Sequence, residues 1–436
     1  MKKQLLLLLL LGCYVQASAI NYPTTSKTLK NGLKVIVCQK PGNDFVYLQV
    51  WYRTGSKDEV PGNRGMAHMF EHMMFRGTQK YPGDVFDKNI EKSGGYSNAS
   101  THSDFTEYHE YIPKTSLELG LDMEADRMSN LVVSQEILNT ERQVVGEEFR
   151  NWTNDWNRNL YLSEYKILYP EGHPYTVNTI GNLDEITAFT AKQCMDFYNN
   201  YYSPNNAFVV VTGDVNPDEV FAMAEKHFGP LTKQLVLKPK ENLPDLVKAA
   251  PKQDEMAIDM FLQVYSYAIP FPAITSKDYY ALDMLTNLLF LDENSLLNNS
   301  LVKKKHQVYA ILSMEESRFF LYQSIQTINF YMSASPGNLK VKKAVKDELA
   351  KVKEEGIPQG LMDNYIKSLE ANDIQYQYSS EYISNDLGWA ELYLGDYNRA
   401  SHVIEQYKKV TNEDLKRVAT TYFSDDQLHV VNIKPE

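Results

Sequence analysis

The chain has 436 residues, of which 43% are hydrophobic and 12% aromatic, so it can bury the cores of about two domains. Its formal net charge of −12 argues against a nucleic acid as a partner, because proteins that bind phosphates present clustered basic residues. A mean hydropathy of −0.42 argues against a protein with many membrane spans.

The N-terminus has the composition of an export signal. Residues 1–3 are basic, residues 5–11 are apolar, and Ala17-Ser18-Ala19 fits a signal cleavage site. Residues 1–19 are therefore predicted to be removed, and the mature protein is expected in the periplasm of a bacterium. Residues 10–13 also resemble a lipobox, in which Cys13 would carry a lipid. A membrane-anchored lipoprotein is thus the alternative to a soluble exported protein.

The elements after the signal are predicted to be strands. Apolar residues alternate over 26–30 and 33–38, and Asn31-Gly32 between them favours a two-residue hairpin turn. Residues 46–51 predict the next strand. The pattern then becomes helical, with a helix expected to begin near Asn63 and to end at Gly77.

That predicted helix contains His68, Glu71 and His72 in the pattern H-x-x-E-H. Two imidazoles four residues apart share a helical face, and Glu71 lies beside them. Zinc held by three protein ligands keeps a position for water and lowers the pKa of that water, and Glu71 is placed to take its proton. With 9 His in the chain, a chance match is the alternative, so a third ligand is needed.

A second helix, predicted over 139–150, supplies the candidate for that ligand. Glu141, Val145 and Glu148 share one of its faces, whereas Glu147 points elsewhere. Glu148 is therefore the predicted third ligand, with Glu141 two turns before it. Solvated acids paired with nearby arginines are the alternative explanation.

The middle of the chain contains a predicted linker, because residues 236–256 combine prolines with lysines. The linker separates predicted domains over 20–235 and 257–436. Residues 189–210 align with 410–431 at a constant offset of 221, which predicts that the domains are duplicates of one α+β unit. The apolar helix predicted over 282–290 has no His-Glu pair, so only the first domain is expected to bind metal.

These motifs together resemble the pitrilysin/insulinase superfamily of zinc peptidases, also called inverzincins. Glu148 follows His72 by 76 positions, within E-x-x-V-V-x-E-E, and residues 94–101 resemble the active-site strand of that family. Other matching segments are 65–68, 75–78, 173–175, 180–181, 202–206 and 209–214. The resemblance extends from about Leu29 to the C-terminus.

The resemblance implies an α+β fold of two homologous α/β-sandwich domains, each a mostly antiparallel sheet with helices packed on it, that form a clam-like half chamber. It also implies one Zn²⁺ per chain, bound by His68, His72 and Glu148. Glu71 would be the general base that activates the water, and Glu141 would lie behind the ligands.

The same resemblance implies how substrate is held. An unfolded peptide would add as a strand beside Asn98, Ala99 and Thr101, so that main-chain hydrogen bonds provide most of the affinity. His102 and His109 lack ligand spacing to a third group and are expected at the surface, with a position behind the ligands as the alternative.

One segment departs from the family pattern. Members that act alone or as homodimers carry an Arg and a Tyr seven residues apart in the second domain, which contact the substrate from across the chamber. Tyr309 takes the place of that Tyr and could donate a hydrogen bond to the oxyanion, but Val302 takes the place of the Arg. Lys303 or Lys305 would be a poor substitute for a bidentate Arg. The chain is therefore expected to pair with a second peptidase-like subunit that supplies Arg and Tyr, or with another copy of itself.

The favoured function is that of an exported zinc endopeptidase acting on unfolded peptides or oligopeptides. Two alternatives stay open. One is a zinc-bearing peptide-binding or assembly subunit that needs a partner chain for activity, and the other is a non-peptidase zinc hydrolase on the same scaffold.

Overall fold

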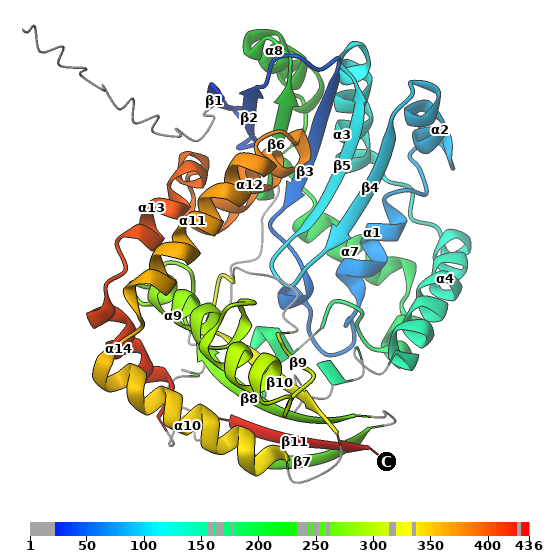
Figure 1. Cartoon of the computed structure of the whole chain (residues 1–436). Coiled ribbons are helices and arrows are strands. Elements are labelled where there is room, and N and C mark those ends of the chain that lie inside the picture. Colours follow the sequence, from blue (N-terminus) through cyan, green and yellow to red (C-terminus); the bar gives the residue numbers. More distant parts are fainter. Residues whose placement is uncertain are drawn as a thin grey trace, which may run out of the picture.

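Two β-sheets lie at opposite ends of the molecule in the computed structural model of the chain (Figure 1). The structure describes residues 22–155, 158, 160–161, 169–176, 178–232, 243, 246, 253–258, 262–313, 320–333, 337–424 and 429–435. The predicted signal, with Ala19 and Cys13, and most of the predicted linker lie outside these ranges. No helix within them has the length and apolar character needed to cross a membrane.

The first sheet has six strands in the order β1-β2-β6-β3-β5-β4. In that order they are β1 Thr24–Thr28, β2 Lys34–Gln39, β6 Ala207–Gly213, β3 Phe45–Tyr52, β5 Thr106–Pro113 and β4 Tyr96–Thr101. Neighbouring strands are antiparallel, except that β2 and β6 are parallel. The strand expected to hold substrate, β4, therefore forms one edge of this sheet.

The predicted hairpin is present, but its loop is longer than expected. β1 and β2 pair from Thr28 and Lys34 onward, which leaves a five-residue connection rather than a two-residue turn. Gly32 takes a positive φ of 97°. The Asn31 side chain donates to the carbonyl of Phe228 at 2.7 Å, so Asn31 ties the loop to the end of a distant helix instead of forming the tight turn.

Helices cover one face of the first sheet. They are α1 Met66–Met73, α2 Val85–Lys92, α3 Leu117–Asn130, α4 Gln135–Asn154, α6 Leu183–Ala188, α7 Ala191–Tyr201 and α8 Pro217–Phe228. Because strand side chains alternate between faces, Leu48 and Val50 of β3 pack against these helices. Trp51, between Val50 and Tyr52, points to the opposite face and belongs to a different core.

The second sheet has five strands in the order β7-β11-β8-β10-β9, which repeats the order of the first sheet without its edge strand β1. Its strands are β7 Gln253–Ile258, β11 His429–Pro435, β8 Gln263–Phe271, β10 Ser324–Met332 and β9 Ala310–Leu312. β11 runs parallel to β7 and antiparallel to β8, as β6 does to β2 and β3. β7 takes up the last residues of the segment predicted as linker.

The second half has its own set of helices. They are α9 Tyr279–Thr286, α10 Gly337–Glu355, α11 Gln359–Tyr376, α12 Ser380–Leu394, α13 Val403–Lys408 and α14 Asn412–Tyr422. α7 and α14 start 221 residues apart, and each begins with a capping box, formed by Thr190 with Gln193 and by Thr411 with Asp414. The predicted duplication of an α+β unit is thus confirmed by topology and by local structure.

A helix of the second half covers the remaining face of the first sheet. α12 lies against β3 and β6 (Figure 1). It can approach closely because Gly388 faces Trp51, where a Cβ atom would come within 2.4 Å of the indole ring. The Gln49 side chain of β3 also donates to the Asn385 side chain of α12 at 2.7 Å.

The first half covers the second sheet in return. Leu160, Tyr161, Tyr169 and Tyr175 form a core with residues of β8, β10 and β11. The Tyr169 hydroxyl accepts the N–H of Ile325 at 2.8 Å. Asp104 accepts the Tyr175 hydroxyl at 2.9 Å and the N–H of Leu321 at 3.1 Å, and its burial raises its pKa to about 6. Each half therefore completes the core of the other.

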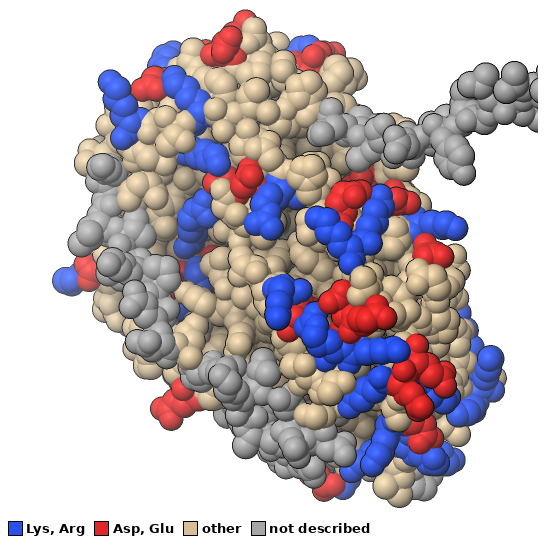
Figure 2. All heavy atoms as spheres, turned by 90° about the vertical axis from the view of Figure 1, so that its left-hand side faces the viewer, with Lys and Arg blue, Asp and Glu red and all other residues tan. Residues whose placement is uncertain are grey.

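The outer face of the second half carries charges of both signs side by side (Figure 2). Lys408 forms ion pairs with Glu370 at 2.9 Å and with Glu405 at 2.8 Å, and Arg417 pairs with Asp414 at 2.9 Å. Exposed pairs of this kind are each worth at most about 1 kcal/mol, so they contribute more to solubility than to folding stability.

Candidate metal centre and substrate cavity

The backbone at the start of helix α1 is fixed by contacts with two other segments. Gly65 precedes it with φ of 96°, and a Cβ on Gly181 would come within 2.3 Å of the Gly65 Cα, so two glycines allow this close crossing. The buried carboxylate of Glu59 accepts the N–H groups of Gly65 at 2.7 Å and Ala67 at 2.8 Å. These contacts satisfy donors that the start of a helix leaves unpaired.

Three side chains from α1 and α4 converge at the surface of the first half. Nε2 of His68 lies 3.6 Å from Oε2 of Glu148, and Nε2 of His72 lies 3.3 Å from the same oxygen. One ligand atom from each of the three residues falls within 4.8 Å of the others. The structure therefore brings together the three ligands that the sequence predicts.

The spacing of these atoms fits zinc. Atoms bound about 2.0–2.2 Å from a tetrahedral zinc lie about 3.3–3.6 Å from one another. Burial, together with the neighbouring His72, lowers the pKa of His68 to about 3, so this imidazole is neutral, as a ligand must be. Its Nδ1 is buried with no hydrogen-bond partner among the described residues, so no described residue fixes which nitrogen carries the proton, and Nε2 is free to take the deprotonated form that a metal needs.

Glu71 lies on the same helix but is not one of the converging ligands. Its Oε2 accepts the Thr101 hydroxyl at 2.6 Å, which fixes the carboxylate against β4. Burial raises the pKa of Glu71, and the carboxylates of Glu107 and Glu148 add to that rise, while the Thr101 hydrogen bond and His72 oppose it. A carboxylate with a raised pKa takes up protons more readily near neutral pH, which suits a general base.

Glu141 lies behind His72, as predicted. Its Oε2 is 3.6 Å from Nδ1 of His72, and its Oε1 is 2.6 Å from Nε of Arg76. Burial raises the pKa of Glu141, but the contacts with His72 and Arg76 outweigh burial and lower it. The anionic Glu141 thus holds Nδ1 of His72 and leaves Nε2 facing the site, which is how outer carboxylates orient metal-binding imidazoles.

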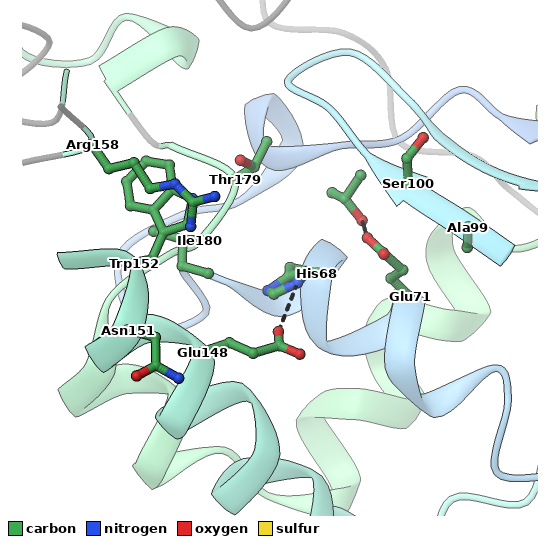
Figure 3. A pocket seen from close by; sticks show the side chains of 11 residues that line it. His68, Glu71, Ala99, Ser100, Glu148, Asn151, Trp152, Arg158, Thr179 and Ile180 are labelled. Carbon is green, nitrogen blue, oxygen red and sulfur yellow. Dashed lines mark hydrogen bonds and ion pairs between the residues drawn. The ribbon is translucent and has the colours of Figure 1, made fainter. Parts of the chain in front are cut away.

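A cavity of about 400 Å³ opens beside these residues (Figure 3). Its lining contains the predicted residues His68, Glu71, Ala99, Thr101 and Glu148. It also contains residues that were not predicted: Ser100, Asn151, Trp152, Arg158, Thr179 and Ile180. Asn151 and Trp152 follow Glu148 by three and four positions, so helical periodicity could have identified them.

Other predicted residues lie away from the cavity. Tyr309, directly before β9, is 65% exposed, and neither it nor Val302 is among the cavity residues. Asn98 of β4 also does not line the cavity and pairs across the strands with His109. The expected surface position of His109 is wrong, because the side chain is 13% exposed and its Nδ1 lies 3.0 Å from Oε1 of Glu107. His102 is stacked on Phe105 with a centroid distance of 4.4 Å.

Two family descriptions match the chain. Residues 34–169 match the insulinase family, peptidase family M16, and residues 188–369 match the peptidase M16 inactive domain. The first range contains all three of the converging side chains, His68, His72 and Glu148. The second agrees with the absence of an H-x-x-E-H pattern from the second half.

Several known proteins match this chain over most of its length. The zinc protease PqqE of Helicobacter pylori is 33% identical over 452 aligned residues, which cover 98% of this chain and 97% of that protein. A crystal structure of a protease from Helicobacter pylori superimposes with a TM-score of 0.87 at 31% identity, covering 95% of this chain and 100% of that one. The periplasmic protease PqqL from Escherichia coli gives a TM-score of 0.77 at 18% identity and matches 95% of this chain but only 48% of its own.

Proposed function

Because the chain belongs to peptidase family M16, the insulinase family, we propose that it is an exported zinc metallopeptidase that hydrolyses peptide bonds in unfolded peptides. The observation that carries this proposal is the convergence of His68, His72 and Glu148, with Glu71 beside them. Export is supported by the signal-like composition of residues 1–19 and by the periplasmic protease among the structural relatives.

In this proposal His68, His72 and Glu148 hold the zinc, and Glu71 moves the proton. Zinc, when bound, polarises the carbonyl of the substrate and acidifies water. Glu71 takes a proton from the attacking water and then delivers it to the leaving nitrogen, a double role that its raised pKa favours. Thr101 keeps the carboxylate of Glu71 at the cavity wall throughout.

The edge of β4 is the proposed binding position for the peptide. A substrate strand beside Asn98, Ala99 and Thr101 would be held by main-chain hydrogen bonds, which do not depend on the side chains of the substrate. Ala99 and Thr101 line the cavity, and Asn98 faces the other side of the sheet. The enzyme is therefore expected to accept many sequences, provided that the peptide is extended.

Removal of zinc is expected to abolish peptide cleavage. The test uses a quenched unfolded peptide, first with zinc-loaded protein, then after treatment with a chelator, and finally after stoichiometric zinc is restored. We expect activity, loss of activity and recovery in that order, because three ligands hold the ion that polarises the carbonyl. Small esters and amides serve as the comparison. Turnover of these compounds without turnover of peptides would favour a non-peptidase hydrolase instead.

We further propose that a second subunit completes the active site. In this chain Val302 stands in the place of the expected Arg, and Tyr309 is exposed and away from the cavity. PqqL is about twice as long as this chain, so it has room for two such units in one polypeptide. The second subunit would be another copy of this chain or a related exported chain. A peptide-binding subunit that is inactive until it meets its partner is the alternative form of the same idea.

Pairing predicts that the activity per chain depends on association. For a homodimer, the specific activity of the zinc-loaded protein should rise with protein concentration, in parallel with the change of molecular mass from monomer to dimer. Tyr309→Phe should lower that activity. For a mixed pair, the activity of the chain alone should be low and should rise when the related chain is added. A monomer whose activity is indifferent to concentration, to Tyr309→Phe and to the related chain would contradict the proposal.

A further inference from the structure

Arg158 is the one permanently positive side chain among the eleven described residues that line the cavity. It extends from the wall that also carries Trp152, and Glu71 and Ser100 lie on the opposite wall (Figure 3). No sequence motif predicts a role for this residue, which lies beyond the end of α4.

The guanidinium of Arg158 packs against an aromatic ring. Its Cζ lies 5.4 Å from the centre of the Trp152 ring, and this ring in turn packs edge to face on Tyr161 with a centroid distance of 6.1 Å. The Arg158 backbone N–H donates to the Asp155 side chain at 3.2 Å. No carboxylate of a described residue forms a salt bridge with the guanidinium. A guanidinium packed against a ring keeps its N–H groups available for a ligand.

The charge of the cavity differs from that of the whole protein. The chain has a net charge of −12, which would favour cationic peptides in general. Within the cavity, however, the two charges of Zn²⁺ would balance those of Glu71 and Glu148. Arg158 then leaves the cavity with a net positive charge, so that an anionic group of the substrate is favoured there.

We propose that Arg158 binds a carboxylate of the substrate close to the cleaved bond. This inference rests on the proposed function and narrows its substrate class to peptides that place a negative charge in the cavity. A planar guanidinium matches a carboxylate through two parallel N–H···O bonds, a geometry that a single carbonyl oxygen cannot satisfy. The carboxylate is supplied either by the C-terminus of a short peptide or by an Asp or Glu side chain.

The test compares peptides that differ in one charge. One pair has the same sequence with a free or an amidated C-terminus close to the cleaved bond, and a second pair, amidated throughout, has Glu or Gln at one position beside that bond. Zinc-loaded protein should cleave the charged member of at least one pair with a kcat/KM about 10- to 100-fold higher, as expected for a hydrogen-bonded charge pair. The pair that shows the preference identifies the source of the carboxylate.

Variants of Arg158 assign that preference to this side chain. Arg158→Met should remove the preference through a higher KM for the charged peptide, with the uncharged peptide unaffected, and Arg158→Lys should retain part of it because the charge stays but the paired N–H groups do not. Arg150→Met is the matched control, because Arg150 is exposed, pairs with Glu147 and does not line the cavity. It should leave the preference intact.

Three results would overturn the inference: no preference in the unchanged protein, a preference that survives Arg158→Met, or an equal loss of kcat for charged and uncharged peptides. The last would mean that Arg158 acts on the reacting carbonyl. If no peptide is cleaved by the chain alone or together with the related chain, the proposed function has failed. The inference is then decided by binding of the same peptides to zinc-loaded Glu71→Gln protein, where the charged peptide should bind about 10- to 100-fold more tightly.

Discussion

Glu71→Gln is expected to lower kcat for peptide hydrolysis by about 1,000-fold or more and to leave the zinc content unchanged. A positioned general base contributes about 100- to 10,000-fold, and here the same carboxylate serves both the water and the leaving nitrogen. The amide has the shape of the carboxylate and can still accept the Thr101 hydroxyl, so the fold of the cavity is preserved. It cannot take up a proton. Activity and metal content are measured on the same preparation.

The control for this change is Glu147→Gln. Glu147 lies on α4 next to the proposed ligand Glu148, but its side chain is 67% exposed and its partner is Arg150. The same chemical replacement at this position should leave kcat within about twofold, as for surface changes in general. Glu71→Gln protein that keeps a tenth of the normal kcat would exclude Glu71 as the base. If the protein acts only by binding peptides, the variant should lose none of its function.

Glu148→Gln is expected to remove zinc and, with it, the activity. The neutral amide replaces the only anionic group among the three proposed ligands. Structural zinc sites with a full set of four ligands contribute about 10–16 kcal/mol, so one weakened ligand is expected to cost affinity on the order of 100-fold. His68 and His72 alone do not hold a catalytic zinc firmly. Metal content after dialysis should fall well below one per chain, and an excess of zinc should restore part of the activity.

The thermal stability of the metal-free protein is the control measurement for Glu148→Gln. The Glu148 side chain is 45% exposed, so its replacement should change the thermal stability of the metal-free protein only slightly. A Glu148→Gln protein that retains one zinc per chain after dialysis would show that another group is the third ligand. A large loss of stability without metal would instead indicate a structural role for this carboxylate.

Local periodicity accounts for the part of the site that could be predicted. His68, Glu71 and His72 lie on one helix, and Glu148 lies on a helix whose faces the sequence defines, so both sets of side chains could be oriented in advance. The geometry then places their ligand atoms within 4.8 Å. The edge position of β4 came from the resemblance alone, because nothing in its own six residues distinguishes an edge strand from a central one.

Tertiary packing accounts for the part that could not be predicted. Arg158 lies beyond the end of α4, and its place in the cavity beside Trp152 is a tertiary contact that no local pattern predicts. The Asn31-Gly32 loop differs from a tight turn because Asn31 finds a partner about 200 residues away, at Phe228. Apolar runs such as β6 predict that both faces of a strand are buried. They do not predict which half of the chain packs against each face.

Because each half of the chain covers a sheet of the other half, the first sheet cannot complete its core until the second half has been synthesised and folded. The face of the first sheet that contains Trp51 and Phe208 is completed by α12, which is synthesised more than 300 residues after Trp51. Until α12 arrives, the half that carries the metal ligands exposes an apolar face and has only part of its core. A newly made chain would therefore acquire a stable active site late, after the second half has folded, and a truncated chain would not become a free peptidase.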